Sequence, residues 1–160
     1  MDTRSPLDPS PGTPQPSFKS ILVAVDGSDH AFDAVRVAAR LATALSAKIT
    51  LMTAYHAPSE ALGEPNYSRA LGEVLGEAQR VLEDASRVAL NAGGPEPQIE
   101  WLAGHPVETI VETAQAGGYD LVVVGTLGRG RLGAALLGSV SSAVAAKAGR
   151  PVLVVGDVLR

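Results

Sequence analysis

The stretch GTLGRGRLGAALLGS, residues 125–139, carries five glycines and two arginines between two apolar runs. Glycines at positions 125 and 128 let the backbone approach a ligand closely, because no Cβ stands in the way. Arg129 and Arg131 can neutralise the charge of a phosphate group. This composition predicts a loop that holds an anionic ligand.

The end of the stretch, Gly138-Ser139, coincides with the expected start of a helix. The first N–H groups of a helix have no acceptors within it, and together with the helix dipole they favour an anion. Ser139 can cap this helix or give its hydroxyl to the same anion. Both ends of the stretch together predict a cradle for the phosphates of a nucleotide.

Three other phosphate or phosphoryl motifs fit less well. The segment GRGRLG matches G-x-G-x-x-G, but the dinucleotide fingerprint follows a first strand and has an acidic residue about 20 positions later. Here the segment follows the fourth expected strand, and only Asp157 comes near that offset. A Walker P-loop requires a Gly-Lys pair, which the chain lacks. A phosphoacceptor receiver domain would have an aspartate where this chain has Leu102-Ala103-Gly104.

The elements that must position the glycine stretch follow from alternating hydrophobic periods. Short apolar runs indicate buried strands, and apolar residues three or four positions apart indicate helices. The expected strands cover residues 21–25, 49–54, 99–102, 121–124 and 152–155. The expected helices begin at Ser28 or Asp29, near Leu71, at Pro106 and at Ser139.

This alternation of strands and helices predicts parallel strands joined by right-handed crossovers. The expected fold class is α/β, a five-stranded doubly wound parallel sheet in the order 3-2-1-4-5 with helices on both faces. Ile99, Glu100 and Trp101 alternate apolar and polar, as in an edge strand. The first and fourth strands, ending near Asp26 and Gly125, would then flank the crevice where such folds bind ligands.

Composition narrows the function classes. The chain has 160 residues, a formal net charge of −4, 4% aromatic residues and no cysteine. Disulfides, thiol nucleophiles and cysteine-ligated metals are excluded, and the acidic balance weighs against nucleic-acid partners. No apolar run reaches the roughly 18 residues that a membrane helix needs. We expect a cytoplasmic protein without a membrane partner.

The first 17 residues differ from the rest. They hold five of the eleven prolines and few apolar residues, which predicts a disordered tail because such a segment buries too little apolar surface to fold. Residues 18–160 are expected to form a single nucleotide-binding α/β domain.

Several residues have a structural interpretation beside a functional one. Asp26 can brace a turn, but its position beside the glycines favours a ligand role. Ser28 and His30 are expected at a helix cap and on the surface rather than as nucleophile and base. His30, His56 and His105 lack metal-ligand spacing, so no metal site is expected. Trp101 is expected in the core.

The chain resembles the universal stress protein family, in particular its nucleotide-binding, ATP-binding subgroup. That subgroup has glycine, two residues, glycine, nine residues, then glycine followed by serine or threonine, and Gly125, Gly128 and Gly138-Ser139 keep this spacing. Four blocks carry the likeness in the same order, ILVAVDGSDHA, AGHPVETIVETA, YDLVVVGTLGRGRL and LLGSVSSAVAAKAGRPVLVV. The likeness extends over residues 18–156.

The resemblance implies ATP, with or without Mg²⁺, as the ligand. It implies that Asp26 lies near the adenosine, with Ala24 and Val25 as the wall, and that Ala54 offers backbone to the adenine. It assigns the ribose and phosphates to Gly125, Gly128, Arg129, Gly138, Ser139, Val140 and Ser141. Leu127 departs from the family, which often has a basic residue or histidine there.

The resemblance also implies a homodimer formed through the last strand, Val152 to Val155. The sequence gives an independent reason, because this apolar edge strand carries no charge or bulge that would prevent pairing with another chain. We expect a dimeric ATP-binding module that senses nucleotide in a stress response. The alternatives are a slow ATPase or self-phosphorylating protein, and a dimeric scaffold with an empty site. No general base or acidic pair for Mg²⁺ is evident, so catalytic residues are not expected.

Overall fold

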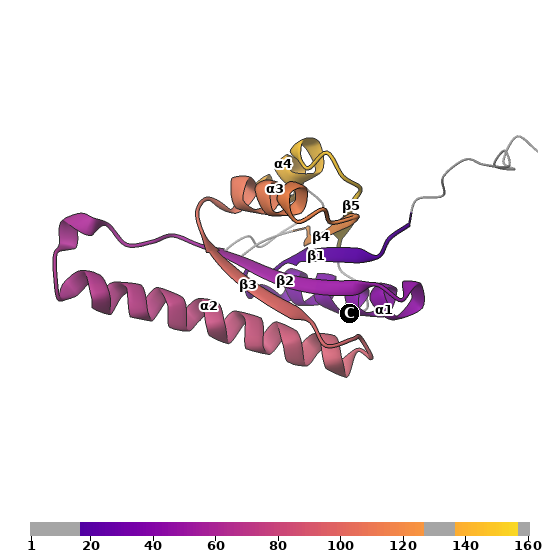
Figure 1. The fold of residues 1–160 in the computed structure, drawn as a ribbon, viewed down its shortest axis with the longest axis horizontal. Helices are drawn as coiled ribbons and strands as arrows, with labels where there is room; N and C mark the ends of the chain where they lie inside the picture. The colour runs from indigo at the N-terminus through magenta and orange to yellow at the C-terminus, as the bar shows by residue number, and fades with distance from the viewer. Residues whose placement is uncertain (1–16, 127–136, 157–160) are drawn as a thin grey trace, which may run out of the picture.

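Five parallel strands form one sheet in the order β3-β2-β1-β4-β5 (Figure 1). The computed structural model describes residues 17–126 and 137–156. The strands are β1 (Ser20–Ala24), β2 (Lys48–Tyr55), β3 (Gln98–Ala103), β4 (Leu121–Gly125) and β5 (Val152–Val155). The predicted strand order is confirmed. The expected tail lies outside the described residues except for Ser17, and so do Leu127, Gly128, Arg129 and Arg131.

Helices cover both faces of the sheet, as predicted. One face carries α1 (Asp29–Leu45) and α2 (Asn66–Asn91), and the other carries α3 (Pro106–Ala116) and α4 (Ser139–Lys147) (Figure 1). A short 3₁₀ helix, η1 (Glu60–Leu62), lies in the connection between β2 and α2. Since a parallel sheet is buried on both faces, its strands are continuously apolar rather than alternating.

The central strand shows how the two cores are divided. Ile21, Leu22 and Val23 of β1 are completely buried. Ile21 and Val23 belong to the core under α1 and α2, while Leu22 belongs to the core under α3 and α4. This division follows from the alternation of side chains along a strand.

The start and packing of α1 follow from its sequence. Ser28 is the N-cap, and its Oγ accepts a hydrogen bond from the N–H of Ala31 at 3.2 Å. This settles the choice between Ser28 and Asp29 in favour of Ser28. The face of α1 that lies on the sheet is rich in alanine, which lets helix and sheet approach closely; its buried apolar members are Ala31, Ala34, Val35, Ala38, Ala39 and Ala42.

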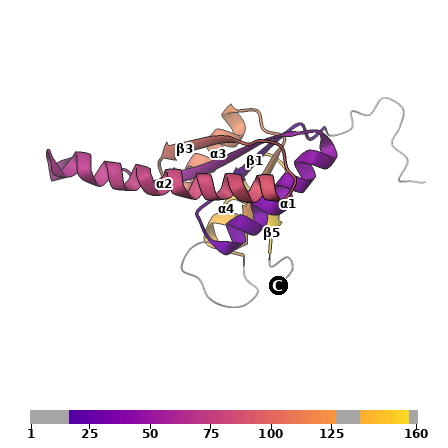
Figure 2. The ribbon, with the colours of Figure 1, turned by 90° about the horizontal axis from the view of Figure 1, so that it is seen from below.

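The long helix α2 is covered unevenly. Its buried residues, Ala78, Val81, Leu82, Ala85 and Ala89, all lie in its C-terminal part. Figures 1 and 2 show that its N-terminal part projects beyond the end of the sheet. Within the described ranges, no helix combines the length and apolar composition needed to cross a membrane.

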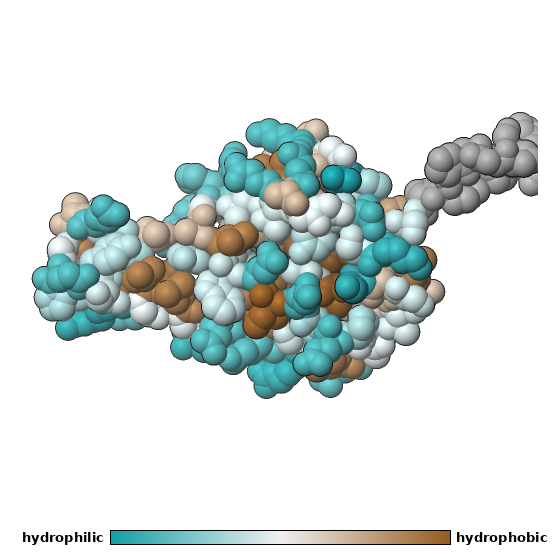
Figure 3. Space-filling view, in the orientation of Figure 1, coloured by the Kyte–Doolittle hydropathy of each residue, from teal (hydrophilic) through white to brown (hydrophobic). Residues whose placement is uncertain are grey.

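Strand β3 is an edge of the sheet, and this makes one prediction wrong. Trp101 is 42% exposed rather than buried in the core. It pairs with Thr53 of β2, and no further strand lies beyond β3 in the part of the chain that the structure describes. Ile99 and Leu102 are similarly exposed, and hydrophobic patches interrupt the polar surface on the side of the molecule that carries β3 (Figure 3).

At the opposite end of the sheet from the C-terminal ends of the strands, Asp120 fastens β1 to β4. Its Oδ2 accepts hydrogen bonds from the backbone N–H groups of Lys19 and Ser20, at 2.8 and 2.9 Å, and from Ser20 Oγ at 3.1 Å. The backbone N–H of Lys19 is the main reason that the pKa of Asp120 is lowered from its ordinary value. This carboxylate therefore stabilises the start of the central strand.

Candidate functional site

A cavity of about 270 Å³ opens at the C-terminal ends of β1 and β4. The chain reverses its direction across the sheet between these two strands, which is where doubly wound folds bind ligands. Its volume is close to the lower end of the about 300–1,000 Å³ typical of ligand pockets. The lining residues are Ala24, Val25, Asp26, Ala31, Met52, Ala54, Pro106, Ile110, Val124, Gly125, Thr126, Gly138, Ser139, Val140 and Ser141.

Nine residues singled out from the sequence come together around this cavity. They are Ala24, Val25, Asp26, Ala54, Gly125, Gly138, Ser139, Val140 and Ser141. The remaining two, Gly128 and Arg129, lie outside the described residues. The structure thus places the described candidates in one location, and their role in binding stays a prediction.

The sequence missed several apolar wall residues. Met52 comes from β2 and Val124 from β4, while Pro106 and Ile110 come from α3. Met52, Ile110 and Val124 belong to the core under α3 and α4. Hydrophobic periodicity predicts that such apolar residues are buried, but it does not reveal which of them border a cavity. Pro106, as the first residue of a helix that follows an expected strand, was the one available signal.

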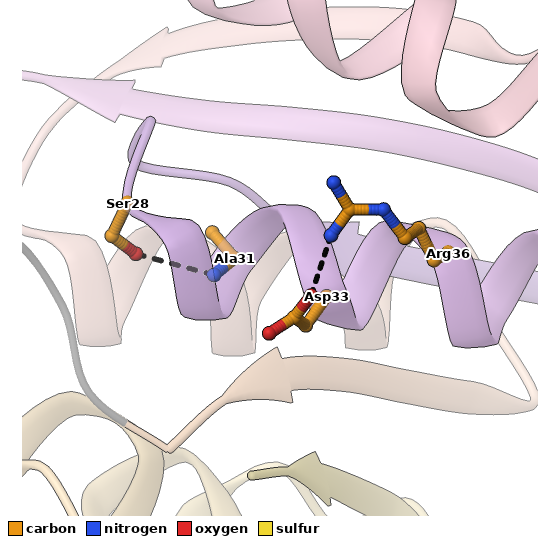
Figure 4. Close-up of polar contacts among 4 residues, drawn as sticks. All are labelled: Ser28, Ala31, Asp33 and Arg36. Atoms are coloured by element: carbon orange, nitrogen blue, oxygen red, sulfur yellow. Dashed lines mark hydrogen bonds and ion pairs between the residues drawn. The ribbon is translucent and has the colours of Figure 1, made fainter. Parts of the chain in front are cut away.

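Asp26 has a structural role in addition to its position at the cavity. Its Oδ1 accepts a hydrogen bond from the backbone N–H of Ser28 at 3.0 Å. Between them, Gly27 has a φ of +80°, which a residue with a side chain rarely adopts. The turn leads directly into α1. Figure 4 shows two contacts in this helix, the capping hydrogen bond from the N–H of Ala31 to Oγ of Ser28 and the ion pair between Asp33 and Arg36. Asp26 therefore braces the turn while it lines the cavity.

The start of α4 is fastened to the end of β4. The N-cap is Gly138, whose N–H donates to the carbonyl of Thr126 at 2.6 Å. The hydroxyl of Ser141, which is buried, lies within hydrogen-bonding distance of the carbonyls of Thr126 and Gly138, at 3.1 and 3.0 Å. Ser139 is the first helical residue and not the cap, so the first of its two predicted roles is wrong.

This arrangement leaves the first turn of α4 suited to an anion. Glycine has no side chain, so Gly138 provides no side-chain capping bond. The N–H groups of Ser139 and Val140 lie in the first turn, where a helix has no internal acceptors. Both residues line the cavity and are exposed. The helix dipole adds partial positive charge at the same place.

The electrostatics of the described wall are simple. Among the described lining residues, Asp26 is the only one with an ionisable side chain. A carboxylate accepts hydrogen bonds from hydroxyl groups and repels phosphates. The cavity therefore has an acceptor at the end of β1, apolar walls from β2 and α3, and an anion-binding helix terminus at α4.

Two of the three histidines lie close together, and the third lies apart from them in the sequence. His30 lies in α1, whereas His56 and His105 follow β2 and β3 and have their ring centroids 5.0 Å apart. Among the described residues, no group of three or more potential metal ligands occurs.

Comparison with known proteins gives consistent matches. The Universal stress protein family matches residues 17–156. A universal stress protein from Thermus aquaticus is 41% identical over 138 residues, which covers 86% of this chain and 98% of the relative. A universal stress protein solved in complex with cAMP is similar with a TM-score of 0.66 and 31% identity, covering 87% of this chain and 97% of that one. The universal stress protein from Archaeoglobus fulgidus in complex with dAMP is similar with a TM-score of 0.64 and 25% identity, covering 87% and 98%.

Proposed function

The chain belongs to the universal stress protein family, and on that premise we propose that its cavity binds an adenine nucleotide, with ATP as the ligand. One observation carries the proposal. Residues chosen for adenosine, such as Asp26 and Ala54, and residues chosen for phosphate, such as Gly138 and Ser139, line the same cavity although they are far apart in the sequence.

The apolar part of the cavity suits the base. A purine is flat and mostly apolar on its faces, and ligand pockets combine such apolar walls with a few polar groups. Met52, Pro106 and Ile110 supply apolar walls, and Ala54 borders them at the end of β2. In our proposal the adenine lies here, with the backbone of Ala54 at its edge.

The polar part of the cavity orients the rest of the nucleotide. The Asp26 carboxylate suits the ribose hydroxyls, because it is an acceptor and they are donors. Phosphates belong at the first turn of α4, since the N–H groups of Ser139 and Val140 and the helix dipole favour negative charge. The opposite orientation would place phosphates against a carboxylate.

Two of the similar structures support an adenine nucleotide. One is a universal stress protein in complex with cAMP, and the other is in complex with dAMP. Both ligands share adenine, a sugar and a phosphate with ATP. The choice of ATP rests on the glycine spacing of the sequence, Gly125, Gly128 and Gly138-Ser139.

We further propose that the protein works as a dimeric nucleotide sensor. β5 is an edge of the sheet, and among the described residues no strand pairs with its outer side, so it is available to a second copy. A binding role fits the described wall, where the single carboxylate, Asp26, already accepts a hydrogen bond from Ser28. ATP that stays intact during incubation at stoichiometric concentration supports a sensor, and steady release of ADP would contradict it.

Calorimetric titration with adenosine, AMP and ATP tests the nucleotide site. ATP is expected to bind more tightly than adenosine, because adenosine has no phosphate to engage the helix terminus. Ser139→Asp should weaken ATP binding at least tenfold and leave adenosine binding nearly unchanged, since an added carboxylate would compete with phosphate. An acidic residue in the first turn is favourable to a helix, by about 0.3–1 kcal/mol, so this variant should fold.

Ser142→Asp is the matched control. It makes the same change of charge in the same turn, but Ser142 is exposed and does not line the cavity. Its ATP affinity should stay close to that of the unmodified protein. Equal losses in both variants would contradict the phosphate position, and absence of binding by all three ligands would contradict the nucleotide proposal itself.

A further inference from the structure

Two histidine rings meet at the ends of neighbouring strands although they are distant in the sequence. His56 follows β2 directly, and His105 comes two residues after β3 ends. The two strands are adjacent and parallel, with Tyr55 in register with Ala103. Their imidazole centroids are 5.0 Å apart and the ring planes make an angle of 72°.

The backbone holds both histidines in place. The N–H of Gly104 donates to the carbonyl of Tyr55 at 2.9 Å, which ties together the two segments that carry the rings. The carbonyl of His105 accepts the N–H of Thr109 at 2.9 Å and its Oγ1 at 2.7 Å. Pro106 restricts the backbone of the residue before it. The proximity of the rings is therefore built into the ends of β2 and β3.

The ring nitrogens of His56 and His105 have no polar partner among residues 17–126 and 137–156. Both residues are exposed, and neither imidazole makes a hydrogen bond or ion pair with a described residue. Neutral imidazole is a good ligand for zinc, copper and nickel ions. We propose that His56 and His105 together bind a transition-metal ion of this class, with Zn²⁺ as the probe.

The ring separation suits a shared metal ion. A zinc–nitrogen bond of about 2.0–2.1 Å puts the metal about 3.2 Å from the centre of each ring, so that tetrahedral coordination separates the centres by about 5 Å. The observed separation is 5.0 Å, with the rings edge to face, so an imidazole must turn about its side-chain torsions for both rings to direct a nitrogen at the ion. The described residues offer no third ligand, so the remaining positions are open to water, as in sites that exchange ligands rather than in closed structural sites.

The location connects this site to the cavity. Ala54 and Pro106 both line the cavity. Ala54 lies two residues before His56, and Pro106 directly follows His105. The positive end of the α3 dipole opposes a cation here, and Glu108 in the first turn of α3 offsets that effect. A metal at the histidine pair would thus be held by residues that lie next to the lining residues in the sequence, and a donor atom of a bound ligand is one candidate for an open position.

Zinc titration of untagged protein, followed by imidazole NMR, tests the proposal without any nucleotide. The chain has three histidines, so His30 serves as an internal reference. The signals of His56 and His105 should shift together and saturate at one zinc ion per chain, while those of His30 stay in place. Because the readout is metal binding alone, failure of the nucleotide proposal would leave this result unaffected.

His56→Gln and His105→Gln should each weaken zinc binding at least tenfold, because even the loss of a residue that only supports a ligand costs about 10–100-fold. Both residues are exposed, so circular dichroism and thermal unfolding should match the unmodified protein. Glu108→Gln is the control for a purely electrostatic effect and should change the affinity less than threefold. Unchanged zinc binding in both histidine variants, or no shift of either ring at 1 mM zinc, would reduce the pair to a packing contact and overturn the proposal.

Discussion

The backbone of His30 occupies the place that a side chain on Gly125 would take. A Cβ at position 125 would lie 2.7 Å from both the carbonyl carbon and the carbonyl oxygen of His30, and 3.0 Å from the nitrogen of Ala31. The end of β4 therefore passes directly against the first turn of α1. This contact gives a structural reason for glycine at position 125 that does not depend on a ligand, beside the predicted role in ligand approach.

Gly125→Ala should destabilise the fold. The added methyl group would collide with backbone rather than with a flexible side chain, so β4 or α1 must shift, at a cost of about 1–3 kcal/mol. Urea denaturation measures the difference. Gly156→Ala is the matched control, because its Cβ would have ordinary contact with Thr126 at 3.6 Å. Equal stability of the Gly125→Ala variant and the unmodified protein would show that the contact can relax freely.

Val154→Pro should convert the proposed dimer to a monomer. The N–H groups of Val122 and Thr126 donate to the carbonyls of Pro151 and Val155, so alternate residues of β5 face β4. By the same alternation, Val154 directs its N–H away from β4, to the side where a second copy would pair. Proline removes that donor and leaves the bonds to β4 in place.

Light scattering coupled to size-exclusion chromatography gives the mass for this test. Val154→Ile keeps the N–H and the apolar character, and it should remain dimeric. A monomeric unmodified protein, or a Val154→Pro variant that is as dimeric as Val154→Ile, would rule out the edge of β5 as the interface.

Asp120 should make the stability depend on pH in the acidic range. The N–H of Lys19 is the largest cause that lowers its pKa below the ordinary 3.8, with smaller help from Ser20 and Arg150, while burial opposes the shift. Because the folded pKa is the lower one, the carboxylate stabilises the fold above about pH 4, and this contribution is lost as the pH falls through the folded value.

Asp120→Asn should therefore be less stable than the unmodified protein at pH 7, and the difference should shrink between about pH 4 and pH 2. Thermal unfolding across this range measures the effect. Asp84→Asn, which removes an exposed carboxylate paired with Arg87 on the same helix, is the control and should show little change. A gap between Asp120→Asn and the unmodified protein that stays constant down to pH 2 would contradict the role of the charge.

The fold was more predictable than the details of the site. Continuous apolar runs and amphipathic stripes located the five strands and the α-helices, because burial on both faces of a parallel sheet leaves a clear pattern. Trp101 was misplaced because an alternating edge strand shows which side chains share a face and not how far a helix covers that face. α2 packs mainly on β2 and leaves that tryptophan half exposed.

The site was predictable where a residue type is demanded by local backbone chemistry. Gly138 and Ser139 could be identified because a helix terminus needs particular residues. Met52 and Ile110 could not, since an apolar residue at a cavity wall looks the same as one in a filled core. The meeting of His56 with His105 also escaped prediction, because it depends on the register between β2 and β3 rather than on sequence spacing.

The uneven burial of α2 has a consequence for how the molecule opens. Its 26 residues span about 39 Å, whereas the eight residues of β2 span about 26 Å. Only the C-terminal part of the helix is anchored by buried side chains. Amide hydrogens near Tyr67 and Leu71 should therefore exchange with solvent through local fraying, while those near Leu82 and Ala85 should wait for opening of the core. A single continuous helix would thus contain two levels of protection, with the boundary set by where the sheet beneath it ends.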